Sequence, residues 1–274
     1  MTAKRASRRA PISTRRMVTP LSGDFYSAVL RLLTSTGMPF VVGGAFAMKH
    51  YAGLTRGTKD IDVFLRESDL EHALATLESA GIVTEKTFPH WLAKGFFGDD
   101  FVDLIFNSAN GLCPVDDGWF ANAPRITLFD VPTRLCPIEE VIWTKSFVME
   151  RERFDGADVC HLIAAQRKPI DWKHLLARYG DNWPVLYGHL VFFGFIYPRE
   201  RDKVPTWVMD ELEEREKTHR RSEDISVCRG TLLSREQYLV DVKERGYADA
   251  RLAPWGSVAK SSLDIWTDAI GKNK

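Results

Sequence analysis

Cysteine is scarce in this chain, and its four copies are scattered rather than paired. Cys113, Cys136, Cys160 and Cys228 form no C-x-x-C motif, and that spacing argues against a zinc site. No secretory signal precedes them, so the sequence predicts reduced thiols, as in a cytosolic protein.

Long apolar runs are also missing. The longest stretch, residues 185–197, is interrupted by Gly188, His189 and Gly194, whereas a helix needs about 20 apolar residues to cross a bilayer. The basic N-terminus is not followed by the apolar region of a secretory signal. We therefore expect a soluble, cytoplasmic protein with no membrane partner.

The chain has no net charge, because 37 Lys and Arg residues balance 37 Asp and Glu residues. Overall electrostatics thus gives no indication of a polyanionic partner. The N-terminus differs, since residues 1–16 contain six Lys or Arg residues and no acid. We expect a solvated, disordered basic tail over residues 1–20. An arm that binds nucleic acid and a transit peptide are the alternatives.

Hydrophobic patterning divides the rest of the chain into three parts. Residues 21–136 predict an α+β (α/β) core with a small mixed sheet. Its expected strands are 40–42, 60–65, 82–88, 91–97, 101–106 and 125–129, and its expected helices are 22–36, 45–51 and one opened by a capping box at residues 68–71. Residues 137–218 predict a helical region, with helices at 138–151, 155–166, 172–179, 183–195 and 205–217. Residues 219–274 form a C-terminal extension, in which one helix is expected at 234–246.

The most informative stretch begins with Gly43 and Gly44, between an expected buried strand and an expected helix. Glycines at such a turn let a phosphate approach the backbone, and the helix N-terminus offers free N–H groups. A strand-to-helix turn also needs glycine for conformational reasons alone, so the pair by itself is a weak indication.

Asp60 and Asp62 are two residues apart in an expected strand, and residues at that spacing share a face. Two adjacent carboxylates repel each other and resist burial, and a divalent cation between them relieves both costs. Mg²⁺ is typically held by one or two carboxylates plus substrate phosphates. A solvated strand end is the plain alternative, and a phosphatase-type nucleophile is another. The residues before Asp60 are not the apolar strand that a phosphatase would have.

Asp103 is the only acid in the apolar run from Phe101 to Phe106. A carboxylate in such surroundings needs a partner, either in a structural salt bridge or as a third metal ligand beside Asp60 and Asp62. In the second case it is also placed to act as a base for an incoming hydroxyl.

Together, Gly43-Gly44-Ala45, the R-x-T-x-D-I-D stretch from Arg56 to Asp62, and Asp103 resemble the DNA polymerase β-type nucleotidyltransferase superfamily. Within it they resemble the minimal nucleotidyltransferases and the toxin-type members of bacterial toxin–antitoxin and abortive-infection systems. The resemblance covers roughly residues 38–107. It implies a nucleotidyltransferase core, a phosphate-binding turn at the glycines, metal ligands at the three aspartates, and nucleotide contacts from Arg56 and Thr58.

The resemblance also has implications for two further parts of the sequence. Many members have Ser after the glycines where this chain has Ala45, so phosphate contacts must come from backbone N–H groups and cations such as Arg56. Downstream, Lys145 and Asp158 match a Lys and a later Asp that complete the nucleotide pocket. Lys145 would neutralise phosphate, and Asp158 would bind a base, a ribose or Lys145 itself. The Arg and Glu residues of 150–153 are expected to be solvated.

The sequence thus predicts an enzyme that uses two Mg²⁺ ions to transfer NMP from an NTP, ATP among them, to an acceptor, with release of pyrophosphate. The acceptor is a tRNA or other RNA, a protein side chain, or a small molecule such as an aminoglycoside. An antitoxin protein is a further partner that the resemblance allows. The alternative is a catalytically silent fold that acts as an antitoxin or as an RNA-binding scaffold.

Overall fold

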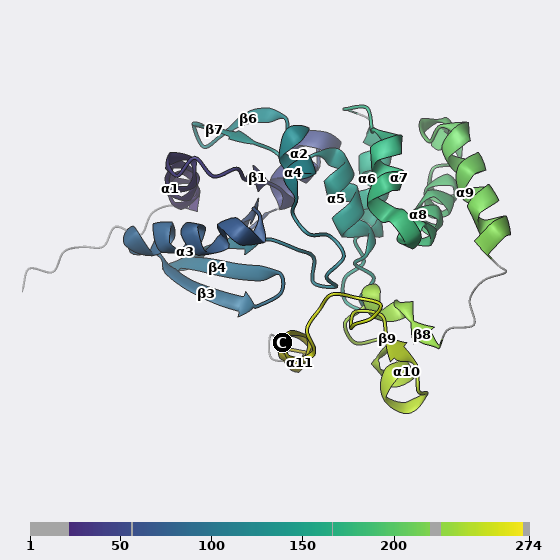
Figure 1. Cartoon of the computed structure of the whole chain (residues 1–274). Coiled ribbons are helices and arrows are strands. Elements are labelled where there is room, and N and C mark those ends of the chain that lie inside the picture. The colour runs from purple at the N-terminus through teal and green to yellow at the C-terminus, as the bar shows by residue number, and fades with distance from the viewer. Residues whose placement is uncertain (1–21, 56, 166, 220–225, 271–274) are drawn as a thin grey trace, which may run out of the picture.

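The computed structural model describes residues 22–55, 57–165, 167–219 and 226–270, and the expected basic tail lies outside them. The N-terminal part contains a mixed sheet (Figure 1), which has five strands in the order β1-β2-β5-β4-β3. These strands are β1 (Val41–Val42), β2 (Asp60–Phe64), β3 (Val83–Phe88), β4 (Leu92–Phe97) and β5 (Asp100–Ile105). Only the β2–β5 pair is parallel. The expected α/β fold with a small mixed sheet is confirmed.

Helices α1 (Ser22–Ser35) and α3 (Leu70–Ser79) bury their apolar faces against this sheet, while α2 (Gly44–Ala52) follows β1 directly. Val29, Leu30 and Leu33 of α1 are fully buried, and so are the alternate β2 side chains of Ile61 and Val63. All five belong to one hydrophobic cluster. The period of 3.6 in the helix and of 2 in the strand thus predicted which side chains form this core.

The C-terminal half is mostly helical, as predicted. It contains α5 (Ile138–Ser146), α6 (Gly156–Ala165), α7 (Trp172–Tyr179), α8 (Trp183–Ile196) and α9 (Thr206–His219). Before them come α4 (Asp117–Ala121) and the hairpin of β6 (Arg125–Leu128) and β7 (Val131–Arg134). A second hydrophobic cluster joins these helices to α2, and its members come from both sides of residue 136. Among the described residues, no helix combines the length and apolarity that crossing a membrane requires.

The extension holds β8 (Val227–Cys228), α10 (Leu239–Glu244), β9 (Ala248–Asp249) and α11 (Lys260–Asp268). It lies below the sheet and the helical part in Figure 1. Short 3₁₀ turns complete the fold at Glu67–Asp69, Gly180–Asn182, Pro198–Lys203 and Arg229–Leu232. The sequence predicted neither β8, β9 and α11 nor α4 and β7; of these, all except α11 are only two to five residues long.

Two expected helix boundaries are wrong. The capping box at Ser68 does not form, because residues 67–69 make a 3₁₀ turn and Asp69 is the N-cap of α3 without a capping bond. The Asp69 carboxylate pairs with Arg66 at 3.3 Å instead. The helix expected to reach residue 151 ends at Ser146, because the chain then folds into a hairpin in which Met149 pairs with Phe154.

Candidate active site

The three carboxylates expected from the sequence lie on one face of two neighbouring strands. Ile61 and Val63 of β2 point into the core, so Asp60 and Asp62 project from the opposite face. The parallel register of β2 and β5 places Asp103 directly beside Asp62. The fold therefore brings together three acids that come from separate parts of the sequence.

Gly43 and Gly44 place the start of α2 against Asp62. Gly44 has a φ of 54°, which glycine adopts readily, and a Cβ atom there would overlap the Asp62 carboxylate. Gly43 donates its N–H to the Asp62 carbonyl oxygen at 2.9 Å. A phosphate at this turn would therefore meet the amides that follow Gly43, which have no acceptor within the helix and carry partial positive charge.

Mutual repulsion and burial change the proton affinity of this site. The pKa of Asp62 is raised to about 7, mainly by burial and then by the negative charges of Asp60 and Asp103. The pKa of Asp103 is also raised by burial, although the adjacent Lys94 partly opposes this. Acids in this situation gain most from a cation placed between them.

Lys94 lies beside these carboxylates, and the sequence did not indicate it. It stands opposite Asp103 in the antiparallel β4–β5 pair. Its Nζ lies 2.5 Å from Asp103 Oδ1 and 4.4 Å from the centre of the Phe101 ring. The alternation of residues 91–97 gives the direction of Lys94, but its partner depends on the register between two strands, which the sequence does not provide.

Thr58 contacts the first of the paired acids. Its hydroxyl lies 2.5 Å from Asp60 Oδ1 and 3.1 Å from the Asp60 carbonyl oxygen, so it holds the carboxylate in one orientation. The nucleotide contact expected of Thr58 stays a prediction. Arg56, the other residue expected there, lies outside the described residues.

Lys145 and Asp158 meet across α5 and α6. Lys145 Nζ lies 2.8 Å from Asp158 Oδ2 and 3.0 Å from Asp155 Oδ2, and the Asp158 side chain is only 3% exposed. Of the three partners that the sequence allowed for Asp158, the structure thus shows the lysine. Its role in nucleotide binding, and that of Lys145, stay predictions.

Arg153 shares this network from the hairpin between α5 and α6. Its guanidinium donates to both oxygens of Asp155, at 3.0 Å and 2.8 Å. Burial alone would raise the pKa of Asp155, but the hydrogen bonds and charges of Arg153 and Lys145 lower it. Both cations also lower the pKa of Asp62, so they act on this carboxylate from the helical side. Arg153 is 67% exposed, as expected of a solvated charge, and nothing in its local sequence indicated these neighbours.

The donor set of Asp60, Asp62 and Asp103 suits Mg²⁺, which prefers oxygen ligands. In the part of the chain that the structure describes, no three His, Cys, Asp or Glu side chains converge as a metal cluster. The carboxylates share a face, and Lys94 balances the charge of Asp103. Asp60 and Asp62 would hold the Mg²⁺ ions, and Asp103 would join them once Lys94 has moved away.

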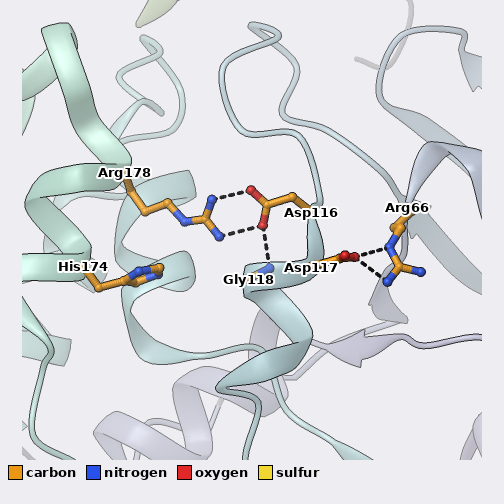
Figure 2. A pocket seen from close by; sticks show the side chains of 6 residues that line it. All are labelled: Arg66, Asp116, Asp117, Gly118, His174 and Arg178. Carbon is orange, nitrogen blue, oxygen red and sulfur yellow. Dashed lines mark hydrogen bonds and ion pairs between the residues drawn. The ribbon is translucent and has the colours of Figure 1, made fainter.

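One cavity is lined by none of these carboxylates. It has a volume of about 600 Å³ and is lined by Arg66, Asp116, Asp117, Gly118, His174 and Arg178 (Figure 2). Its charges are already paired: Arg178 contacts Asp116 at 2.5 Å and 2.8 Å, and Arg66 pairs with Asp117. Arg178 also binds the fully buried Glu140. These bonds tie α4, α5 and α7 together, so they serve the fold rather than a ligand.

The sequence matches no protein-family model and no characterised protein at a significant level. Several solved structures are similar in shape. The solution structure of the antibiotic-resistance factor ANT(2'')-Ia is 16% identical, with a TM-score of 0.37, over 72% of this chain and 94% of that one. A crystal structure of ANT(2'')-Ia with adenylyl-2''-tobramycin is 18% identical, with a TM-score of 0.36, over 65% and 97%.

A third similar structure is the lincosamide antibiotic adenylyltransferase LnuA with bound lincomycin. It is 14% identical, with a TM-score of 0.37, over 53% of this chain and 96% of that one. At these identities and TM-scores, the likeness carries no conclusion about what this chain does.

Proposed function

We propose that this chain is a Mg²⁺-dependent nucleotidyltransferase that transfers NMP from an NTP to an acceptor and releases pyrophosphate. The observation that carries the proposal is the placement of Asp60, Asp62 and Asp103 on one face of β2 and β5. The N-terminus of α2 abuts Asp62 through Gly44. Three carboxylates that repel one another beside a helix N-terminus suit cations and phosphates bound together.

Positive charge on the helical side of the carboxylates supports the proposal that a triphosphate binds there. Lys145 and Arg153 act on Asp62 from α5 and from the hairpin that follows it. Both are held by Asp155, and this fixes their direction before a substrate arrives. A triphosphate between them and the carboxylates would contact cations on both sides, which is how phosphoryl transfer is usually stabilised.

The carboxylates would have different roles in the reaction. Asp60 and Asp62 would hold two Mg²⁺ ions, which neutralise the phosphates and stabilise the attacking and leaving oxygens. Asp103, with its raised pKa, would accept the proton of the acceptor hydroxyl or amine. The acceptor atom then bonds to the α-phosphorus, the bond from that phosphorus to the bridging oxygen breaks, and pyrophosphate leaves. Lys94 favours the ionised form of Asp103, because it lowers the pKa of that carboxyl, and the acceptor would replace it.

The proposed reaction requires of its acceptor only a nucleophilic hydroxyl or amine. An RNA such as a tRNA end, a protein side chain and a small molecule such as an aminoglycoside all provide one. ATP as the nucleotide, a toxin role with an antitoxin partner, and the cytoplasm as compartment stay predictions from the sequence.

A catalytically silent binding module is the second candidate, and one cavity favours it. This cavity of about 490 Å³ between α2 and the β6–β7 hairpin is lined by Phe46, Lys49, His50, Ile126, Thr127, Leu128, Phe129 and Arg167. Its lining has three basic residues and no acid. Burial and the charges of Lys168 and Arg167 lower the pKa of His50, so the positive charge of this lining comes from Lys49 and Arg167. Cations beside aromatic rings suit the phosphates and bases of a nucleic acid.

The test is transfer of label from each α-labelled NTP to a cell extract in the presence of Mg²⁺. The natural protein is compared with Asp62→Ala and with the control Asp99→Ala, an exposed acid on the β4–β5 turn. Label that needs Asp62 but not Asp99 would support the enzyme, and the labelled fraction would identify the acceptor class. If no NTP gives label and none binds, the enzyme is refuted. RNA binding that falls steeply with salt would then support the second candidate.

A further inference from the structure

The hairpin between α5 and α6 carries Arg153 directly after its turn. Met149 pairs with Phe154, Glu150 donates its N–H to the Arg153 carbonyl oxygen at 2.8 Å, and Asp155 donates its N–H to the Val148 carbonyl oxygen at 3.0 Å. The Arg153 guanidinium is bound by the carboxylate of Asp155, the residue that closes this hairpin. The position of this hairpin therefore decides where its guanidinium lies.

The C-terminal extension holds this hairpin from outside. Both carboxylate oxygens of Glu150 accept bonds from it: Ser234 Oγ donates at 2.6 Å and the Arg235 N–H at 2.8 Å. Met149 donates its N–H to the Leu233 carbonyl oxygen at 2.9 Å. Ser234 is only 3% exposed, so these bonds are shielded from water and stronger for it.

The same extension is anchored to the sheet domain. Asn110, in the loop that follows β5, donates from its side-chain amide to the Leu232 carbonyl oxygen at 2.7 Å. Val258, Leu263 and Trp266 form a small cluster that packs on Phe88 and Ala109.

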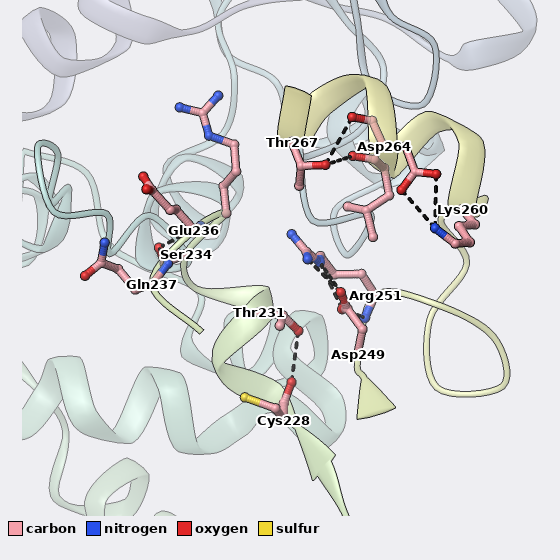
Figure 3. A network of polar contacts seen from close by, with 12 residues as sticks. Cys228, Thr231, Ser234, Glu236, Gln237, Asp249, Arg251, Lys260, Asp264 and Thr267 are labelled. Atoms are coloured by element: carbon pink, nitrogen blue, oxygen red, sulfur yellow. Dashed lines mark hydrogen bonds and ion pairs between the residues drawn. The ribbon is translucent and has the colours of Figure 1, made fainter. Parts of the chain in front are cut away.

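An internal ion pair makes the extension a firm support (Figure 3). Arg251 is fully buried, donates from Nε and Nη2 to the Asp249 carboxylate at 2.9 Å and 2.6 Å, and lies 5.7 Å from the centre of the Trp266 ring. The extension thus links the strand that carries Asp103 to the hairpin that carries Arg153.

We propose that residues 226–268 complete the active site, with Glu150 as the positioning residue through which they fix Arg153 to bind the β- and γ-phosphates of the NTP. This inference rests on the proposed function. An exposed arginine on a free hairpin would lose conformational entropy when it binds phosphate. A hairpin held in advance by the extension avoids part of that loss, and preorganisation of this kind appears as affinity.

The experiment measures the affinity for α,β-methylene NTPs with Mg²⁺ by titration calorimetry, since this needs no acceptor. The nucleotide that binds the natural protein most tightly is used for all variants. We expect Glu150→Gln to raise Kd roughly ten-fold, as loss of a hydrogen bond to a charged group does. The control is Glu152→Gln, which removes the same charge from the same hairpin. Glu152 is exposed and has no bond to another described residue, so its Kd should stay within about two-fold.

A double-mutant cycle separates positioning from simple loss of stability. Arg153→Ala should also raise Kd roughly ten-fold, and adding Glu150→Gln to it should cause no further loss, because Glu150 acts through Arg153. The inference would be overturned if the double variant showed the product of the two increases in Kd. It would also be overturned if Glu150→Gln and the natural protein had equal Kd values. Neither result would contradict the proposed function. Absence of NTP binding by the natural protein would overturn both.

Hydrogen exchange of the substrate-free protein tests the structural link alone. The Arg235 amide donates to Glu150, so it should exchange faster in Glu150→Gln than in Glu152→Gln. Equal exchange in the two variants would show that Glu150 does not hold the extension, and the inference would fail whatever the nucleotide affinity.

Discussion

Replacing Asp62 by asparagine should stabilise the metal-free protein above neutral pH, because it removes a charge that the fold disfavours. The pKa of Asp62 is raised from 3.8 to about 7, first by burial and then by Asp60 and Asp103. One pKa unit corresponds to about 1.36 kcal/mol. The ionised form therefore costs the folded state up to about 4 kcal/mol at high pH.

The sign follows from where the proton is bound. Between about pH 4 and pH 7 the folded protein holds a proton on Asp62 that the unfolded chain has lost. The stability of the natural protein therefore falls as pH rises through this window, and it levels off above the folded-state pKa of about 7. An asparagine side chain at this position has no proton to lose, so the advantage of Asp62→Asn should be small near pH 4 and full by pH 8.

The assay is urea unfolding at several pH values between 4 and 8 in EDTA, with Asp99→Asn as the exposed control. We expect Asp62→Asn to gain about 2–4 kcal/mol at pH 8 and Asp99→Asn to change by less than about 0.5 kcal/mol. Mg²⁺ should then stabilise the natural protein and not Asp62→Asn, because a ligand that binds the folded state adds to its stability. A gain that is the same at pH 4 and pH 8, or no gain at all, would refute the electrostatic account of this site.

Two further predictions concern neighbours of the carboxylates. Gly44→Ala should reduce transfer activity by at least about 100-fold, because the new Cβ would overlap the Asp62 carboxylate and the backbone there has a φ of 54°. The control is Gly57→Ala, because a Cβ at that position meets nothing within 4 Å. Equal activity of the two alanine variants would contradict the close approach at Gly44. Lys94→Met should raise the pKa of Asp103 further, since the lysine lowers it, and should move the acidic limb of the pH profile of kcat/KM to higher pH. An unmoved acidic limb would show that Asp103 is not the group that titrates.

The sequence by itself determined the local part of this site. The period of 2 in β2 puts Asp60 and Asp62 on one face, and the glycine pair marks the turn into α2, because both depend only on residues close in the chain. The long periodic segments also predicted most helices and the strands of the main sheet. Short elements such as α4, β7 and β8 were missed, because two to five residues carry too little pattern to identify them.

The tertiary structure alone decided which distant residues meet. Asp103 lies beside Asp62, and Lys94 beside Asp103, through the register of strand pairs. Glu150 holds the extension through bonds that span about 85 positions of sequence. The sequence predicted a solvated Arg153 and gave the extension no role, because their contacts form at a hairpin that interrupts an expected helix. Local patterns fix the direction of a side chain, whereas its partner is chosen by packing between elements, which has no signature in a single sequence.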